Sequence, residues 1–173
     1  MNTTQLKLDL YNWVKDNSGL AANKIIWANQ ASPQPAPTYI VLEILTGPNQ
    51  IGFDNQIYDS GSDSFSSCGI REFTLSIQAF GKTSHQELTD LLGKLNLSDS
   101  TDYFSTKNLS VINLPSVTNL TVALDNVFEE RHGLDIIFNT SQEISSGISQ
   151  IRNTEGSFEF SEPTITGNFE VQT

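Results

Sequence analysis

The chain has 173 residues, of which only 17% are charged, and its net charge at pH 7 is −11. Its nine Lys and Arg residues are dispersed, whereas a surface that grips nucleic-acid phosphates needs them concentrated, so the sequence disfavours specific nucleic-acid binding. The only cysteine, Cys68, excludes an internal disulfide framework, and no apolar run has the length that spans a membrane. We therefore expect a single domain over residues 1–173, in a reducing cytoplasm and without a membrane partner.

The N-terminal segment predicts a helix followed by a short strand. Apolar residues recur there at the spacing of one helix face, which indicates a helix over about residues 4–16. These residues are Leu6, Leu10, Trp13 and Val14. Thr3 or Thr4 is expected to cap the start of the helix, and Asn17-Ser18-Gly19 to end it. Residues 24–27 predict the short strand.

A proline-rich segment leads into a long apolar strand. Pro33, Pro35 and Pro37 have a fixed φ and no amide donor, so they predict a stiff crossover segment. Residues 38–45 predict a strand that is apolar on both faces, which is typical of a strand inside a sheet or of one covered by a partner chain. Gly47-Pro48-Asn49 predicts a turn.

The middle of the chain predicts a hairpin and a second helix. Residues 51–58 are expected to return as a strand, and residues 59–69, rich in Ser, Gly and Asp, to form a mobile loop. Residues 71–79 alternate between apolar and polar, as a half-exposed antiparallel strand does. The sequence Ser84-His85-Gln86-Glu87 predicts a capping box that starts a helix over residues 84–96. Its sheet-facing stripe is Leu88, Leu91, Leu92 and Leu95.

The second half of the chain is expected to consist mainly of strands. Residues 97–106 are polar and predict a turn, and residues 109–114 predict a strand. For residues 117–124 the pattern leaves a strand and irregular structure both open. Residues 129–138 alternate clearly and predict the last strand of the sheet.

The C-terminal tail, residues 156–173, is expected to be extended. Phe158 and Phe160 alternate there with acidic residues, as in an edge strand or a strand that binds a partner. Together, the order of helices and strands predicts an α+β fold: a mixed, mainly antiparallel β-sheet with two helices packed on one face.

Motifs of catalysis and cofactor binding are missing from the sequence, which contains no P-loop, no G-x-S-x-G and no G-x-G-x-x-G. His85 and His132 lie near no cysteine or paired carboxylate, so we interpret them as surface histidines and expect no metal ion. Asp54, Asp59 and Asp63 do not have the spacing of a calcium-binding EF-hand loop. We therefore expect neither an enzyme nor a cofactor.

Three segments of the chain form an ordered pattern. Residues 25–45 read IIWANQASPQPAPTYIVLEIL, with an Asn-Gln turn and alternate prolines before an apolar strand. Residues 73–81 read FTLSIQAFG, and residues 128–138 read FEERHGLDIIF, with Arg131 near the start of a strand. This order resembles the tail terminator (neck terminator) proteins of tailed bacteriophages, and the resemblance extends over about residues 3–160.

The resemblance implies a virion structural protein with a tail-terminator-like fold. Such a protein caps the head-proximal end of the tail tube as a ring, usually a hexamer, ends tube polymerisation and joins the tail to the neck. The implied partners are other copies of the chain, the tail tube protein, the neck or connector proteins and possibly a sheath protein. The implied location is the tail–neck junction of the virion, where DNA passes through the ring without specific binding.

Eight residues are the candidates for the subunit or tube interface: Trp27, Pro33, Pro35, Pro37, Tyr39, Phe53, Arg71 and Arg131. Two interpretations of the arginines are open. Arg71 and Arg131 form a binding site, or they pair across strands with Glu72, Glu129 or Glu130.

Two other functions remain open from the sequence. One is a head-completion or adaptor protein of the phage neck. The other, from a different class, is a secreted carbohydrate-binding or adhesin module, which the many Ser, Thr and Asn residues would fit. That module needs an exposed aromatic platform, and Trp13 and Trp27 are instead expected in a helix stripe and an apolar run.

Overall fold

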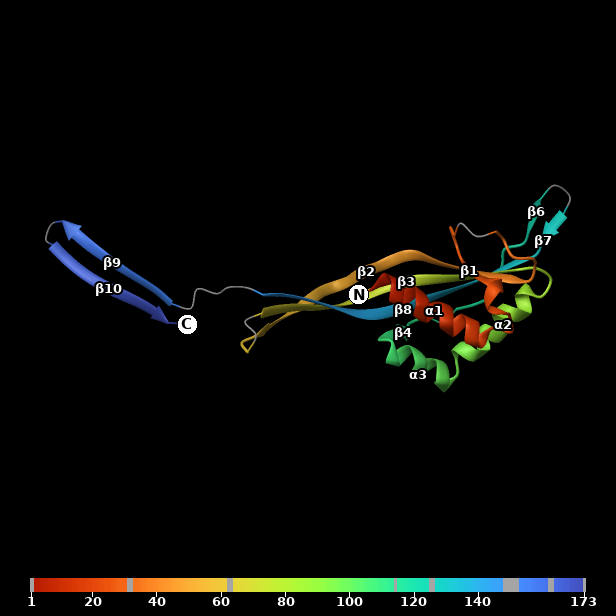
Figure 1. The fold of residues 1–173 in the computed structure, drawn as a ribbon, viewed down its shortest axis with the longest axis horizontal. Helices are drawn as coiled ribbons and strands as arrows, with labels where there is room; N and C mark the ends of the chain where they lie inside the picture. The colour runs from red at the N-terminus through yellow and green to blue at the C-terminus, as the bar shows by residue number, and fades with distance from the viewer. Residues whose placement is uncertain are drawn as a thin grey trace. The chain divides into compact units, whose positions relative to one another are not determined.

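The computed structural model describes residues 2–30, 33–61, 64–113, 115–124, 127–147, 153–161 and 164–172 (Figure 1). The chain forms two compact units. The larger comprises residues 1–54 and 68–143, and the smaller comprises residues 55–67 and 144–173. None of the described helices is long and apolar enough to cross a membrane.

The larger unit is built on a mixed sheet with the strand order β1-β2-β3-β8-β4, and β5 also pairs with β8. The strands are β1 (Ile25–Trp27), β2 (Tyr39–Asp59), β3 (Ser64–Phe80), β4 (Leu109–Val111), β5 (Thr118–Asn119) and β8 (Arg131–Gly147). β1 runs parallel to β2, and β4 and β5 run antiparallel to β8. The expected α+β fold with a mixed, mainly antiparallel sheet is confirmed.

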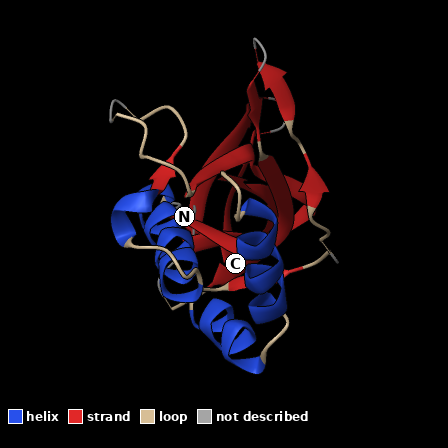
Figure 2. Ribbon diagram, turned by 90° about the vertical axis from the view of Figure 1, so that its right-hand side faces the viewer, coloured by secondary structure: helices blue, strands red, loops and turns tan. Residues whose placement is uncertain are grey.

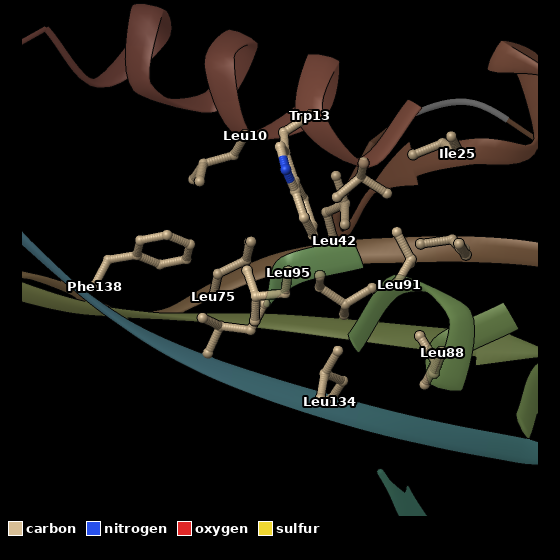
Figure 3. Close-up of a cluster of buried hydrophobic side chains, with 14 of the residues drawn as sticks. Leu10, Trp13, Ile25, Leu42, Leu75, Leu88, Leu91, Leu95, Leu134 and Phe138 are labelled. Atoms are coloured by element: carbon tan, nitrogen blue, oxygen red, sulfur yellow. The ribbon is translucent and has the colours of Figure 1, made fainter. Parts of the chain in front are cut away.

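Three helices cover one face of this sheet: α1 (Thr3–Asn17), α2 (Ser84–Leu95) and α3 (Ser98–Thr106) (Figure 2). Leu10 and Trp13 point from α1 toward the sheet, and Leu88 and Leu91 reach it from α2 (Figure 3). Each of the three buried leucines stabilises the fold by about 1.5–3 kcal/mol. The layer of helices therefore supplies the driving force that holds the larger unit together.

The strands supply the other side of this core, through the apolar residues that alternate along β3 and β8. Phe73, Leu75 and Ile77 on β3 are at most 1% exposed, as are Leu134 and Ile136 on β8. Their alternation with polar residues was the basis of both strand predictions, which are confirmed. The helix predicted over residues 4–16 and the helix predicted from residue 84 are confirmed as well.

The first helix has a different cap from the one expected. The side chain of Asn2, and not that of Thr3 or Thr4, accepts hydrogen bonds from the backbone amides of Thr4 at 3.0 Å and Gln5 at 3.3 Å. Asn2 has an extended backbone, which lets its side chain reach two amides that lack partners inside the helix.

The turn predicted at residues 47–49 is wrong, because β2 continues through it as one strand of 21 residues. Residues 51–58 therefore extend the same strand and do not return along it. β1 pairs only with residues 40–42 of β2, so among the described residues the same side of β2 has no pairing strand beyond Leu42. An edge strand tolerates proline, since a missing amide donor there costs no ladder hydrogen bond.

The turn predicted for residues 97–106 is also wrong, because these residues form α3, a third helix on the sheet. The helix is polar apart from Tyr103 and Phe104, which is why its sequence pattern is weak. Tertiary contacts decide it: the Phe104 ring centroid lies 5.1 Å from that of Trp13, and Trp13 Nε1 donates a 3.0 Å hydrogen bond to Ser100 Oγ. Packing of this kind stabilises a short helix that its own propensity would not.

Several element boundaries also differ from the expected ones. Residues 64–69, expected to be irregular, begin β3. The strand predicted over residues 109–114 is shorter, as β4, and Leu114 lies outside the described residues. The segment 117–124, which the sequence left open, contains β5 and β6 (Val122–Leu124). The strand expected at residue 129 is divided into β7 (Val127–Glu129) and β8.

In the smaller unit, β9 (Asn153–Ser161) and β10 (Thr164–Gln172) form an antiparallel hairpin. The strand expected around Phe158 and Phe160 is thus confirmed as β9. The tail predicted to be extended is two strands, and the residues that connect them lie outside the described part.

Candidate functional site

The described residues contain no cluster of three or more His, Cys, Asp or Glu side chains that could hold a metal ion. The candidate functional residues are instead those on surfaces that a partner protein could contact. The eight candidate interface residues all lie in the larger unit, which fixes how they are arranged.

Arg71 is buried on β3 and forms a bidentate ion pair with Asp54 on β2. Its Nη1 and Nη2 atoms donate to the two carboxylate oxygens of Asp54 at 2.7 and 2.6 Å, and its Nε donates to Gln142 Oε1 at 2.9 Å. The hydrogen bonds to Asp54 raise the pKa of the Arg71 guanidinium. The structure thus supports cross-strand pairing, although the acidic partner is Asp54 and none of the three glutamates considered from the sequence.

Arg131 is half-buried at the start of β8 and is held without an ion pair among the described residues. Its Nη2 donates a hydrogen bond to Gln78 Oε1 on β3, and its guanidinium carbon lies 5.1 Å from the ring centroid of Phe80. Its Nε is buried without a hydrogen-bond partner. The charge pairing with Glu129 or Glu130 considered from the sequence is therefore not what holds this side chain.

The proline-rich segment is fastened at several points to the rest of the larger unit. Tyr39 is 2% exposed and its ring stacks on that of Phe80, with centroids 4.7 Å apart. Gln34 donates a hydrogen bond to the Tyr39 hydroxyl, and Thr38 Oγ1 shares a hydrogen bond of 2.8 Å with Thr83 Oγ1. Burial raises the pKa of the Tyr39 hydroxyl above its usual value near 10.

Only glycine fits where this segment passes the end of β3. Gly81 has a φ of +107°, and a Cβ added there would lie 3.1 Å from Pro37 Cβ and from Thr38 Oγ1. The segment therefore presents its prolines from a fixed position: Pro33 and Pro37 are exposed and Pro35 is half-buried.

Phe53 is fully exposed on β2, with a relative exposure of 104%. Two other apolar residues of this strand, Leu45 and Ile51, are 51% and 45% exposed. Single exposed apolar residues are common, but these three lie where no described strand pairs with the β1 side of β2, and together they form a surface suited to a partner.

The side chains of His85 and His132 lie in contact, although the two residues are far apart in the sequence. The ring centroids of His85 and His132 are 5.1 Å apart and the rings meet edge to face. The buried Ser84 shares a 2.9 Å hydrogen bond with His132 Nδ1, so its hydroxyl does not form the predicted capping box with Glu87. Thr83 precedes the helix and caps it with no side-chain hydrogen bond.

A shallow hollow on the outer side of α1 was not anticipated from the sequence. It measures about 490 Å³ and is lined by Thr3, Thr4, Lys7, Leu8, Tyr11 and Trp27. Trp27 lines it and packs against the hydrophobic core, and Leu8 is 49% exposed. A usable signal was present, since Leu8 is a large apolar residue outside the buried stripe of the helix.

The comparison of the chain with protein families decides its identity. The family described as phage neck terminator protein matches residues 5–164. The chain belongs to this family. No curated protein matches it significantly.

Phage neck terminators are virion structural proteins and not enzymes, which confirms the resemblance stated from the sequence and the expectation that the chain has no catalytic role. Family membership places a neck terminator at the neck–tail junction of the virion, assembled with tail tube and neck proteins. The exposed surfaces of this chain are therefore candidate contacts with other virion proteins.

Proposed function

We propose that this neck terminator caps the head-proximal end of the phage tail tube as a hexameric ring. There it ends tube polymerisation and joins the tail to the neck or connector proteins. The observation that carries the proposal is the family match over residues 5–164, which covers most of the chain. We further propose that residues 1–173 act as one domain and that a sheath protein is a further neighbour where the tail has one.

The unpaired side of β2 supports assembly into a ring. From residue 43 to residue 53, no described strand pairs with the β1 side of β2. A free edge of this length offers backbone donors and acceptors to the strand of a neighbour. Phe53 and Leu45 add exposed apolar surface. A contact between two different surfaces of the same chain generates a ring when the rotation closes.

The charge of the chain supports the passage of DNA through such a ring. The net charge is −11, and the basic residues are dispersed along the chain. An acidic lining repels DNA phosphates and lets the duplex pass without being held.

Electron microscopy of tails with this protein labelled by gold tests the proposal. We expect the label at the head-proximal end of the tube, and we expect phage without the gene to produce tails of irregular length that fail to join heads. A label on the baseplate or in the capsid shell, or tails of normal length and attachment without the gene, would overturn it.

A further inference from the structure

The β6–β7 hairpin has an exposed apolar surface that nothing in the described chain covers. Its two strands pair only with each other, with Val122 opposite Glu129 and Ala123 opposite Phe128. Phe128 is 74% exposed and Val122 is 52% exposed. A two-stranded ribbon is marginally stable by itself in water. A partner that covers Phe128 would therefore both bind the hairpin and stabilise it.

The hollow on α1 is an apolar surface whose aromatic residues are fixed by contacts with the rest of the larger unit. The Trp27 ring packs on the hydrophobic core, and the Tyr11 hydroxyl donates a 3.0 Å hydrogen bond to the carbonyl oxygen of Ala22. Leu8 stands beside them, half-exposed. At about 490 Å³ the hollow has room for an aromatic side chain, and its fixed aromatic walls lose little conformational entropy on binding.

The two surfaces also carry opposite charges. Among the described residues, Lys7 is the only charged one that lines the hollow, and its Nζ lies 5.3 Å from the Trp27 ring centroid. The hollow also includes Thr3 and Thr4 at the N-terminus of α1, a 15-residue helix whose first turn carries no acidic residue. Both features favour a negatively charged partner. The hairpin supplies that charge, because Glu129 and Glu130 follow Phe128 and neither makes an ion pair among the described residues.

We propose that the β6–β7 hairpin of one copy docks into the α1 hollow of the neighbouring copy. Phe128 then packs against Leu8 and Trp27, and Glu130 faces Lys7. The proposal rests on the ring proposed above and names the segments that form its subunit contact. Within the larger unit the hairpin extends beyond the end of the sheet, whereas α1 lies on the helix-covered face (Figure 1). Two different surfaces are thus joined, as a closed ring requires.

Disulfide trapping in assembled particles tests the contact directly. Cys68→Ser removes the only cysteine of the chain, and Phe128→Cys and Leu8→Cys are then introduced into two separately tagged copies of this background. Oxidised particles made from both copies should yield a disulfide-linked dimer that carries both tags. When both substitutions are in one chain, oxidation should yield a ladder of disulfide-linked oligomers that ends at the ring size.

Ile112→Cys replaces Phe128→Cys in the matched control. Ile112 is 45% exposed and lies outside both surfaces, so the control should yield no dimer.

Charge reversal tests the same contact without cysteines. Lys7→Glu and Glu130→Lys should each lower the fraction of tails that carry the ring about tenfold, and the double variant should restore it. Both residues are exposed, so each single variant should melt as the wild type does.

The outcomes separate the contact from the function. Rings at the tail end without the dimer, or with a double variant no better than the single ones, would overturn the contact and leave the capping function standing. A Phe128→Cys copy that crosslinks to the tube or neck protein in place of another copy would also overturn it. Absence of the protein from the tail–neck junction would overturn both.

Discussion

The guanidinium of Arg71 grips both carboxylate oxygens of Asp54, and a glycine beside the pair makes this possible. A Cβ added to Gly69 would lie 1.8 Å from Asp54 Oδ1 and 2.6 Å from Arg71 Nη1. Gly69 thus leaves the space in which a charge pair ties β2 to β3 at the border of the larger unit.

Gly69→Ala should therefore lower the melting temperature, because its methyl group forces the ion pair apart. Gly93→Ala is the matched control. Gly93 lies inside α2 with nothing within 4 Å of an added Cβ, so the change should stabilise the fold by about 0.5–1 kcal/mol through helix propensity. Thermal melts of both variants check the pair of predictions. Equal melting temperatures for Gly69→Ala and the wild type would contradict the role given to the Arg71–Asp54 pair.

Arg131→Ala should destabilise the fold by about 1–2 kcal/mol. The variant leaves Oε1 of the half-buried Gln78 without the donor it has in Arg131 and removes the cation from the face of the Phe80 ring. A chemical denaturation curve beside a tail-assembly complementation assay measures the effect. Normal stability with failed tails would instead place Arg131 in a contact with another virion protein, as the sequence suggested.

Ser100→Ala should cost about 1–3 kcal/mol, because Trp13 Nε1 would be left buried without an acceptor. Ser105→Ala on the same helix changes an exposed serine and should cost less than about 0.5 kcal/mol. Urea denaturation of the two variants makes the comparison. If both lose the same stability, the Trp13–Ser100 hydrogen bond does not hold α3 in place.

Stability should fall at alkaline pH because of Tyr39 and Tyr103. Burial raises the pKa of both hydroxyls, so the folded state keeps these protons at a pH where the unfolded chain loses them. Their contribution is present in full below pH 10, the ordinary pKa of a tyrosine hydroxyl, and is lost as pH rises through the higher folded-state pKa of each group. Ultraviolet titration should show both tyrosines ionising above pH 10. Tyr39→Phe should make the alkaline loss of stability smaller.

The connection between β2 and β3, residues 60–63, should be cleaved by protease in the free protein and protected in assembled tails. Its Ser, Gly and Asp residues predict an ordering that depends on a neighbour, whereas residues 64–69, for which the sequence predicted the same, lie in β3. Residues 62 and 63 within the segment lie outside the described part of the chain. Limited proteolysis of both forms, followed by mass spectrometry, checks the prediction, and equal cleavage in the two states would refute it.

The elements that the sequence predicted correctly are those whose burial leaves a strong local period. The alternation on β3 and β8 and the leucine stripe of α2 each reflect a face that packs on one core, so the pattern is readable from neighbouring residues alone. Trp27 was a candidate contact from the sequence, and it lines the α1 hollow that the structure adds. The hollow itself could not be predicted, since it combines residues of α1 with one of β1.

Local sequence therefore determined the fold class, the main helices and strands and the family of this neck terminator. The tertiary structure decided the rest. Contacts with Trp13 stabilise α3 as a helix. Strand β2 continues through Pro48, because no strand pairs with its β1 side there among the described residues. Asp54 is the ion-pair partner of Arg71. In each case the deciding energy comes from residues far apart in sequence: Trp13 and Ser100, for example, are 87 positions apart. A local pattern records which face of a segment is buried, but not which distant side chain will complete it.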